Sequence, residues 1–403
     1  MRILVLNCGS SSVKSAVVDS ATGNRLFDVQ IEDIGKASCR LHSNHETDEL
    51  GAQTTFTDAV RLVISTMRTC SDAIDHIAAT AHRVVHGGSQ FVQPALIDEQ
   101  SLHAIDTLSV LAPLHNPPAI AAIRIAREAL PDIPHVAVFD TAFHATLPAQ
   151  AYEYALPRDL TARLGIRRFG FHGASHAHVT AAVAAHLQTT PQSLRIISCH
   201  LGNGASISAI EYGRSVETSM GMTPMEGLVM GSRAGDIDPG VLLHLLQSNE
   251  FDVAELDELL NSKSGLVGLT DTNDMREIEQ RAAAGDEPSR LAIAVYAHRV
   301  RKYIGAYTAV MGGVDVIAFT GGIGEHSALI RHRCTQRLEF LGAALDEDAN
   351  RGVNFESTVS VATISQQQSR TRLIAVRTNE ELTIAREAAM RLVDLPGTDQ
   401  QAS

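Results

Sequence analysis

The sequence has few cysteines, no long apolar run and no excess of positive charge. Its five cysteines are widely scattered and form no Cys-x-x-Cys motif, so it predicts neither a disulfide framework nor a zinc ribbon. No run approaches the roughly 20 apolar residues of a membrane span. The apolar start at residues 3–6 is also too short for the core of a signal peptide. We therefore expect a cytoplasmic protein that contacts no membrane.

The charge balance is acidic. The chain has 33 Lys and Arg against 46 Asp and Glu, a formal net charge of −13 at pH 7. Nucleic acids and anionic membranes bind basic surfaces, so neither is expected as a partner. A small anionic substrate is still compatible with this charge, provided that cations gather locally to bind it. The length of 403 residues predicts two or three globular domains, and the 44% of hydrophobic residues suffice for sizeable cores.

Short apolar runs alternate with helical patterns, which is typical of the α/β class. Strands are expected at 3–6, 13–18, 135–139, 196–200, 207–210 and 314–319, and helices at 57–67, 173–187 and 286–312. Asn116, which precedes Pro117, is the expected N-cap of a further helix. Thr378 and Glu381 fit a capping box at the start of the last helix, and residues 396–403 are expected to fray.

Two segments about half the chain apart share one plan. Residues 3–10 and 197–204 each contain a strand and a Gly-containing turn, and another strand follows each of them. The turn Gly202-Asn203-Gly204 is itself a strong hairpin signal. Residue identity between the segments is low, so two interpretations are open: a duplicated domain, or two unrelated hairpins.

Three Gly-rich turns are candidates for binding phosphate or a nucleoside. They lie at residues 7–14, 200–206 and 319–326, each after an apolar strand. Glycine lets backbone N–H groups approach an anion, and Lys14 adds a charge to the first turn. The first turn is not a Walker A loop, because it lacks that spacing and a strand follows it. Taken alone, a polar hairpin turn is the simpler interpretation of the first segment, and an Asn-Gly hairpin explains the second equally well. The third, a Gly-rich link from strand to helix, is weak evidence alone, but the three together are much stronger.

Several polar residues lie where an anion could bind. Arg83 stands in an apolar run and needs either an internal carboxylate or a bound anion. Arg233, near two aspartates, is either a positioned guanidinium or part of a surface salt bridge. His172 precedes a helix N-terminus, a favourable place for a donor to an anion. Asp140 follows an expected strand. The 18 histidines show no zinc-ligand spacing.

Taken together and in order, the motifs resemble the acetokinase family of the sugar-kinase/Hsp70/actin superfamily. The resemblance covers nearly the whole chain. It includes LNCGSSSVK (6–14), HRVVHGG (82–88), LAPLHNPP (111–118), FDTAFH (139–144), RRFGFHGASH (167–176), HLGNGAS (200–206), SVETSMGMTPMEGLVMGSRAGDIDP (215–239), FTGGIGEH (319–326) and TNEEL (378–382).

The resemblance implies a fold and an assembly. It implies two duplicated actin-like or ribonuclease H-like α/β domains, each a central sheet flanked by helices, with an active-site cleft between them. Residues 1–144 with 378–403 would form the acyl and phosphate domain, and residues 145–377 the nucleotide-binding domain. The family also implies a homodimer.

The resemblance further implies a carboxyl-accepting phosphotransferase that uses ATP and acetate, with Mg²⁺ or Mn²⁺, to make acetyl phosphate and ADP. Asp140, His172 and Arg233 match catalytic residues. Arg83 matches the carboxylate-binding residue, and Val85, Leu114, Phe171 and Pro224 match an apolar pocket for the methyl group. Asn7 and Glu380 match the magnesium site. The residues that match nucleotide contacts are Lys14, His200, Leu201, Gly202, Asn203, Gly204, Asp274, Met275, Arg276, Gly322, Ile323, Gly324, Glu325 and His326.

Two functional questions stay open at this stage. A propionate or other short-chain acyl kinase is the nearest alternative, because one methylene is worth only about 1–3 kcal/mol of discrimination in an apolar pocket. A non-catalytic ATP-binding switch of the actin or Hsp70 kind is more remote, since it needs no carboxylate-binding Arg83. His326 stands where the family usually has Asn, which affects the expected nucleotide preference. Asp140 matches the family's acid/base, but acetate is already ionised, so we expect it to orient other groups.

Overall fold

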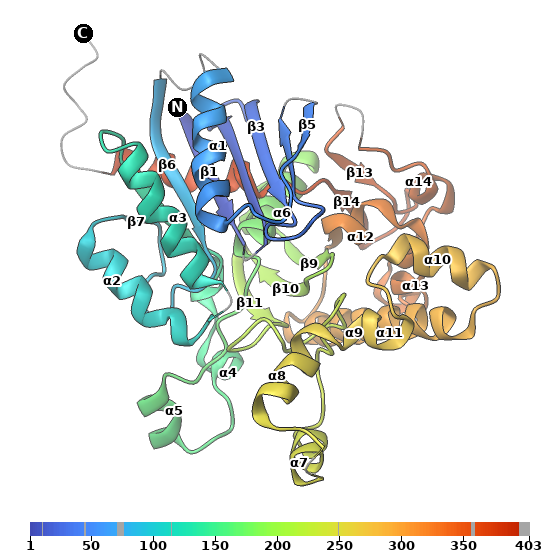
Figure 1. The fold of residues 1–403 in the computed structure, drawn as a ribbon. Helices are drawn as coiled ribbons and strands as arrows, with labels where there is room; N and C mark the ends of the chain where they lie inside the picture. Colours follow the sequence, from blue (N-terminus) through green and yellow to red (C-terminus); the bar gives the residue numbers. More distant parts are fainter. Residues whose placement is uncertain are drawn as a thin grey trace. The chain divides into compact units, whose positions relative to one another are not determined.

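The computed structural model describes residues 1–9, 11–43, 46–70, 76–113, 115–248, 250–355 and 359–394. The chain divides into two compact units (Figure 1): unit 1 comprises Met1–Ala142 with Asn379–Ser403, and unit 2 comprises Phe143–Thr378. The expected interdomain cleft stays a prediction, and the expected fraying of 396–403 lies outside the described residues. No helix in the described part of the chain is long and apolar enough to cross a membrane.

Unit 1 is built on a sheet with the strand order β5-β4-β3-β2-β1-β6-β8-β7. Strands β1 to β5 pair antiparallel in sequence order, whereas β1, β6 and β8 are neighbouring parallel strands. The bounds of the strands are β1 Arg2–Cys8, β2 Val13–Asp19, β3 Arg25–Glu32, β4 Arg40–Ser43, β5 Glu46–Glu49, β6 Ile77–Val84, β7 Ala95–Leu96 and β8 His135–Phe139.

Helices cover both faces of this sheet. They are α1 Phe56–Cys70, α2 Glu99–Thr107, α3 Asn116–Ala129 and α15 Glu380–Val393. The side chains of Leu4 and Leu6 pack in one core with α1 and α3. Since side chains alternate along a strand, Ile3, Val5 and Asn7 share the opposite face. Helix α15 packs on β1, β2, β6 and β8 and lies behind the sheet in Figure 1.

Unit 2 has a second sheet, with the strand order β11-β10-β9-β12-β14-β13. Its strands are β9 Arg195–Leu201, β10 Ala205–Glu211, β11 Arg214–Thr218, β12 Val316–Thr320, β13 Val361–Thr363 and β14 Arg372–Val376. Its helices are α4 Ala149–Tyr152, α5 Arg158–Leu164, α6 Gly173–His186, α7 Pro239–Gln247, α8 Val253–Ser262, α9 Gly265–Thr270, α10 Met275–Ala283, α11 Glu287–Val310, α12 Gly321–His326, α13 Ala328–Thr335 and α14 Glu347–Arg351. Short 3₁₀ helices cover Leu108–Val110, Ala142–Thr146, Pro191–Ser193 and Glu339–Leu341.

The two sheets share one topology. The series β3-β2-β1-β6-β8 in unit 1 corresponds to β11-β10-β9-β12-β14 in unit 2. In each, the first three strands are antiparallel and the last three are parallel. The β1–β2 and β9–β10 hairpins share the strand–turn–strand plan noted in the sequence. They therefore occupy equivalent positions in the two sheets. This confirms the predicted α/β class and favours the duplicated domain over two unrelated hairpins.

The predicted N-cap of α3 is wrong. Asn116 is the first residue of the helix, and His115 is the cap, without a side-chain capping bond. The Asn116 amide, fully buried, accepts from His86 N at 3.1 Å and donates to His86 O at 3.1 Å. An amide satisfies both backbone groups of His86 at once, whereas a capping contact would leave them unpaired in the interior.

The predicted capping box of α15 is also wrong. Asn379 caps the helix, with its Oδ1 accepting from Leu382 N at 3.1 Å. Glu381, the expected reciprocal partner, lies 3.3 Å from Arg25 Nη2. Thr378 is bonded to Glu325 instead. The predicted pattern of a hydroxyl and a carboxylate three residues apart is present, but tertiary partners engage both residues.

Candidate functional site

The first group of predicted site residues lies at one edge of the sheet of unit 1. Asn7 belongs to β1 and Arg83 to β6, while Asp140 directly follows β8. Because these strands are parallel neighbours, their carboxyl ends meet at the same edge. Glu380, the first residue of α15, is close enough to act electrostatically on Arg83 and Asp140. The fold of unit 1 thus brings together four residues that are far apart in sequence.

The Arg83 guanidinium and the Asp140 carboxylate form a bidentate ion pair. Arg83 Nε donates to Asp140 Oδ1 at 2.9 Å, and Nη2 donates to Oδ2 at 2.5 Å. Arg83 Nη1 also donates to Asn7 Oδ1 at 3.1 Å. Asp140 is only 2% exposed, so this charge-assisted contact is shielded from solvent. Of the two partners that the sequence allowed for Arg83, the structure shows the internal carboxylate.

Arg83 keeps donor capacity beyond these contacts. A guanidinium has five N–H groups, and Asp140 and Asn7 engage three of those on Arg83. Burial lowers the pKa of Arg83, but the carboxylates of Asp140 and Glu380 outweigh it and raise the pKa above its ordinary value. The group is therefore always charged and has two further N–H groups with which to bind a carboxylate.

Glu380 places a second carboxylate near Arg83. The pKa of Glu380 is raised, mainly by burial. Asp140 and Glu381 also raise this pKa, and Arg83 lowers it by a smaller amount than burial raises it. Its carboxylate forms no hydrogen bond or ion pair with the residues that the structure describes. Lys14 pairs with Asn7 across the β1–β2 hairpin, and its ammonium lies 4.0 Å from Glu32.

Glu387 belongs to the same surroundings, and sequence reasoning missed it. It lies two turns after Glu380 on α15, and therefore on the same face of the helix. Burial and, to a smaller extent, Asp140 raise the pKa of Glu387 to about 7. A glutamate seven residues after Glu380, on an amphipathic helix, was the signal that could have found it.

We expect Glu387→Gln to stabilise the protein at pH 8 but not at pH 4.5. The folded-state pKa of about 7 lies above the unfolded value of 4.5, so the native state binds more protons in that window. Stability is therefore lost as pH rises from 4.5 to 7, and a neutral glutamine avoids that loss. The gain at pH 8 should be about 1–3 kcal/mol, measured by urea unfolding.

The matched control for this variant is Glu250→Gln, which neutralises an exposed carboxylate. It should leave the unfolding free energy nearly unchanged at both pH values. An equal gain at pH 4.5 and pH 8 for Glu387→Gln would show that packing, and not titration, causes the effect.

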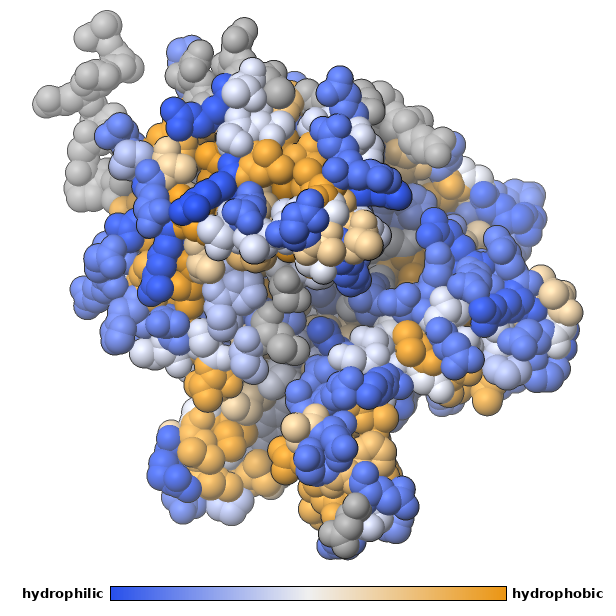
Figure 2. All heavy atoms as spheres, viewed as in Figure 1, coloured by the Kyte–Doolittle hydropathy of each residue, from blue (hydrophilic) through white to orange (hydrophobic). Residues whose placement is uncertain are grey.

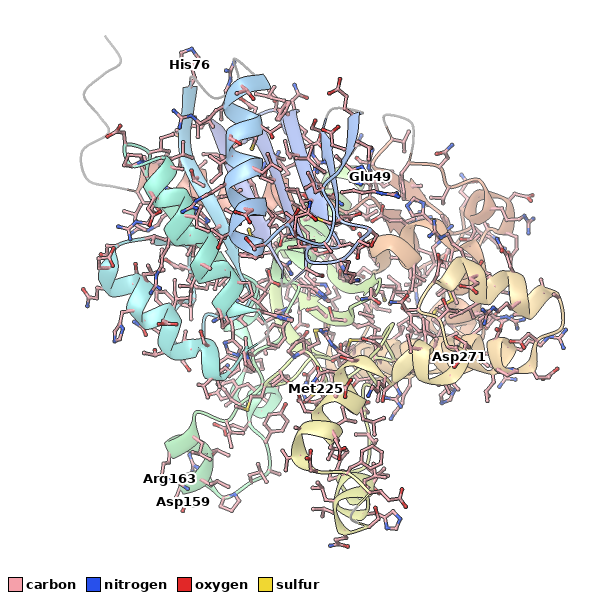
Figure 3. The ribbon with its side chains drawn as sticks, in the orientation of Figure 1. Glu49, His76, Asp159, Arg163, Met225 and Asp271 are labelled. Carbon is pink, nitrogen blue, oxygen red and sulfur yellow. The ribbon has the colours of Figure 1, made fainter. Side chains whose placement is uncertain are left out.

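Unit 2 contains a cavity of about 710 Å³ beside the second and third Gly-rich segments. Its walls are the β9–β10 turn, the start of α10, and α12. Asp271, labelled in Figure 3, ends α9 and begins the connection to α10. The predicted nucleotide-binding residues that line the cavity are Gly202, Asn203, Asp274, Met275, Arg276, Gly322, Ile323 and His326. Asn273, Glu279 and Ser327 also line it and were missed from sequence.

The third Gly-rich segment is a helix and not the connecting loop that the sequence suggested. Helix α12 begins at Gly321, whose φ is +78°. A Cβ at Gly321 would lie 2.7 Å from Leu201 O, so the backbone of α12 can approach β9 only with glycine there. The close approach places the start of α12 against the β9–β10 turn.

Several other predicted nucleotide-binding residues do not line this cavity. They are Lys14, His200, Leu201, Gly204, Gly324 and Glu325. Glu325 Oε1 accepts from Gly321 N at 3.1 Å and from Thr378 N at 2.9 Å, which fixes the start of α12. Leu201 is fully buried, and His200 Nδ1 lies 2.7 Å from Ser175 Oγ. A nucleotide contact for these residues stays a prediction.

His172 lies at the N-terminus of α6, as the sequence predicts. It is the N-cap, in a left-handed conformation with φ +57°. Its ring stacks on His200 with 4.3 Å between ring centres. A Cβ on Gly204 would lie 3.2 Å from His172 Nε2, so that side of the ring borders the β9–β10 turn. The ring is well placed to donate to an anion held by this turn.

A chain of buried hydroxyls and imidazoles extends from His172. His172 Nδ1 lies 2.9 Å from Ser206 Oγ, and His176 Nε2 lies 2.8 Å from the same oxygen. His176 Nδ1 lies 2.9 Å from Ser198 Oγ. Ser198, His176 and Ser206 are fully buried, and burial lowers the pKa of His176 well below its ordinary value. His176 is therefore neutral, with one N–H to share between two hydroxyls.

Arg233 has no carboxylate partner in the described part of the chain. Its Nη1 donates to Pro224 O at 3.3 Å. The aspartates near it in sequence are engaged elsewhere: Asp236 lies 3.2 Å from Arg299, and Asp238 caps α7. Burial lowers the pKa of Arg233. The surface salt bridge is therefore the wrong interpretation, and a desolvated guanidinium of this kind suits an anionic ligand.

The four residues predicted to bind the methyl group fall in different places. Val85 is half-buried and directly follows β6 in unit 1. Phe171 is buried in unit 2, where half-buried Pro224 precedes Met225, which is labelled in Figure 3. Leu114 lies outside the described residues. Their joint pocket stays a prediction.

Comparison with known proteins places this arrangement in context. The model of the acetokinase family matches residues 2–386. An acetate kinase from Halothermothrix orenii is 45% identical over 405 residues, which covers 98% of this chain and 100% of the relative. An acetate kinase from Clavibacter michiganensis is 44% identical over 391 residues, which covers 96% of this chain and 98% of the relative.

Solved structures agree with the sequence comparisons. A propionate kinase from Francisella tularensis superposes with a TM-score of 0.89 at 40% identity and covers 96% of this chain and 98% of its own. An acetate kinase from Porphyromonas gingivalis superposes with a TM-score of 0.89 at 39% identity and covers 97% of this chain and 99% of its own.

Proposed function

Because the chain belongs to the acetokinase family, we propose that it reversibly transfers the γ-phosphoryl group of ATP to acetate, giving acetyl phosphate and ADP. The observation that supports this most directly is the Arg83 guanidinium. Asp140 and Asn7 hold it in place, and two N–H groups remain to bind the carboxylate of acetate. An ATP-binding switch without catalysis needs no such group.

The other charged groups then have separate roles. Arg233 and His172 contact the transferring phosphoryl group, whose charge spreads over three oxygens in the transition state. Asp274 and Arg276, with the β9–β10 turn at Gly202 and the start of α12 at Gly322, bind the nucleotide in the cavity of unit 2. Lys14 binds ATP. Transfer requires both the carboxylate-binding group of unit 1 and the phosphate-binding groups of unit 2.

No general base is needed for this reaction. Acetate attacks through a carboxylate oxygen that is already ionised at neutral pH, so no proton has to leave the nucleophile. Asp140 serves instead to hold Arg83 in one orientation, as its bidentate contact indicates. Catalysis then consists mainly of positioning and of fixed positive charge.

Asn7 and Glu380 fit a magnesium ion. Mg²⁺ prefers oxygen ligands and is bound by one or two carboxylates together with substrate phosphates. The structure offers the Asn7 amide oxygen and the Glu380 carboxylate, whose burial raises its pKa and favours a nearby cation. The described residues contain no group of three or more His, Cys, Asp or Glu that could hold a metal. The ion would neutralise charge on the phosphates.

Ser206 sets the proton position on His172 in this proposal. Ser206 Oγ has one proton and contacts two imidazole nitrogens. When it accepts from His176 Nε2–H, it donates to His172 Nδ1, and the His172 proton is then on Nε2. That nitrogen borders Gly204 and can donate to the phosphoryl group.

We expect Ser206→Ala to lower kcat about 10- to 100-fold with little change in the KM for ATP, because the imidazole loses the partner that fixes its tautomer. Ser208→Ala is the matched control, since Ser208 is equally buried on β10 but bonds to Ser215 and Glu217. Steady-state kinetics of both variants measure the effect. An equal decrease of kcat in both variants would show that the effect comes from removing a buried hydroxyl of β10 and not from the contact between Ser206 and His172.

Acyl specificity is the main alternative within this proposal. A propionate kinase has a similar structure, so propionate, which is one methylene longer than acetate, is the alternative substrate to test. Comparing kcat/KM for acetate, propionate and butyrate in a hydroxamate assay decides between them. A clear preference for propionate would contradict the proposal that acetate is the substrate. If no acyl phosphate formed with Mg-ATP, the proposed kinase activity itself would be wrong.

The homodimer that the family implies has a candidate surface in unit 2. Helix α7 has no buried residue although most of its side chains are apolar. Leu243 on α7 is 58% exposed. Exposed Leu156 precedes α5 and exposed Leu164 is its last residue; Asp159 and Arg163 of this helix are labelled in Figure 3. Figure 2 shows apolar side chains gathered over α5 and over α7 with α8. Large exposed apolar patches mark interfaces, and we propose that a second copy covers this one.

We expect Leu243→Glu to convert the dimer into monomers, because it places a charge in the centre of the apolar surface of α7. Light scattering coupled to size-exclusion chromatography measures the mass. Leu291→Glu changes an equally exposed leucine on α11 and should leave the dimer intact. A monomeric parent protein, or a dimer unaffected by Leu243→Glu, would contradict this surface.

A further inference from the structure

A second cavity in unit 2, of about 830 Å³, lies between α10, α11 and α13. Part of its wall is aliphatic and includes Ile293, Ala297 and Leu329. Its charged lining residues are mostly cations: Arg290, Arg299, Arg301, Arg333 and Arg337, against a single acid, Glu279. Such a gathering of arginines needs an explanation in a chain whose net charge is −13.

Three of these arginines have no carboxylate partner among the described residues. Arg290 pairs with Glu287 at 2.9 Å, and Arg299 pairs with Asp236 at 3.2 Å. Arg301, Arg333 and Arg337 form no ion pair within the described ranges, and the buried Nε of Arg301 has no hydrogen-bond partner there. A buried donor without a partner costs free energy, and neighbouring cations repel one another. A bound anion would offset the repulsion among the cations that line the cavity, whereas the Arg301 Nε is closed to solvent and is not counted among its contacts.

We propose that this cavity binds a small polyanion with two or more phosphate or carboxylate charges. Guanidinium groups bind phosphates and carboxylates through paired N–H groups, which suits them to this class of ligand. The volume of about 830 Å³ lies in the range of small-molecule sites and exceeds that of the nucleotide cavity. The aliphatic wall would contact the uncharged part of the ligand.

The cavity shares structural elements with the nucleotide cavity. Helix α10 contributes Met275 and Arg276 to the nucleotide cavity and Ala282 to the arginine-lined one, and its N-cap Asp274 also lines the nucleotide cavity. Glu279 lines both and accepts a hydrogen bond from Ser327, the N-cap of α13. Helix α13 in turn carries Arg333. A polyanion that links Arg333 to α11 therefore alters nucleotide affinity, and the coupling is reciprocal.

The test is calorimetric titration of the full chain with pyrophosphate and, in a separate arm, citrate. Saturating ADP without Mg²⁺ fills the nucleotide cavity during both titrations. We expect the double variant Arg333→Glu, Arg337→Glu to weaken binding at least tenfold. Both residues are exposed, so the fold should persist, which circular dichroism checks. Ala294→Glu, which adds a carboxylate at an exposed lining position, should weaken binding without removing a cation.

Arg214→Glu is the control, because it reverses an exposed charge elsewhere in unit 2 and should bind within twofold of the parent. Tighter binding of pyrophosphate than of citrate would identify phosphates as the ligand class, and the reverse would identify carboxylates. Absence of binding in both arms, or equal affinity in the parent and the double variant, would overturn the site. An ADP affinity that does not change with saturating polyanion would overturn the coupling. None of these readouts depends on phosphotransferase activity.

Discussion

Replacing Arg233 with methionine should lower kcat about 10³-fold while the KM values for ATP and acetate change only a few-fold. The guanidinium has no carboxylate partner in the described part of the chain and is desolvated, so its charge is available to an anion. A cation that meets the transferring phosphoryl group contributes mainly in the transition state and is worth about 10³- to 10⁵-fold in related reactions. A loss confined to kcat is the signature of an interaction made only there.

Two comparison variants make the Arg233 result specific. Arg233→Lys keeps a charge but loses the planar fork, and it should recover only part of the rate. Arg214→Met removes an exposed arginine of the same unit and should be active. A rise in the KM for ATP with unchanged kcat would assign Arg233 to nucleotide binding instead, and this proposal would then be wrong.

Local patterns explain why the fold was largely predictable. The alternation of apolar strands and helices and the Gly-containing hairpins at Gly9 and Gly202 depend on residues near one another in sequence. Each was sufficient to place a strand pair, whereas β3, β6, β11 and β14, which complete the two equivalent series, were not predicted. The resemblance of ordered motifs to one family predicted the residues that now cluster around Arg83.

Tertiary choices among several partners explain what was missed. The sequence shows that Arg83 needs an anion but cannot show that Asp140, 57 positions later, supplies it. Thr378 and Glu381 fit a capping box locally, yet Glu325 and Arg25 engage them. Glu325 lies inside a predicted nucleotide-binding motif, but its carboxylate accepts hydrogen bonds from Gly321 and Thr378 at the start of α12. In each case the local pattern names the right residue type, and packing decides its partner.

Replacing Asp140 with asparagine should lower kcat/KM for acetate at least about 10²-fold, because a misplaced binding group costs roughly this much. An asparagine side chain replaces one of the two carboxylate oxygens with an NH2 group. That NH2 group is a donor facing an N–H donor of Arg83, so the bidentate contact is lost. Arg83 could then turn away from the acetate site. Since acetate needs no base, the residual activity should keep the pH dependence of the parent enzyme.

A double-mutant cycle with Arg83→Lys separates positioning from direct participation. If Asp140 acts by holding Arg83, then Asp140→Asn should cost much less when Arg83 is already lysine, because the bidentate pair no longer exists. Additive losses would mean that Asp140 contacts the reacting groups independently of Arg83. A parent-like rate for Asp140→Asn would exclude both roles. The cycle thus tests whether the buried ion pair, shielded from solvent at 2% exposure of Asp140, is what fixes the guanidinium that we propose to bind acetate.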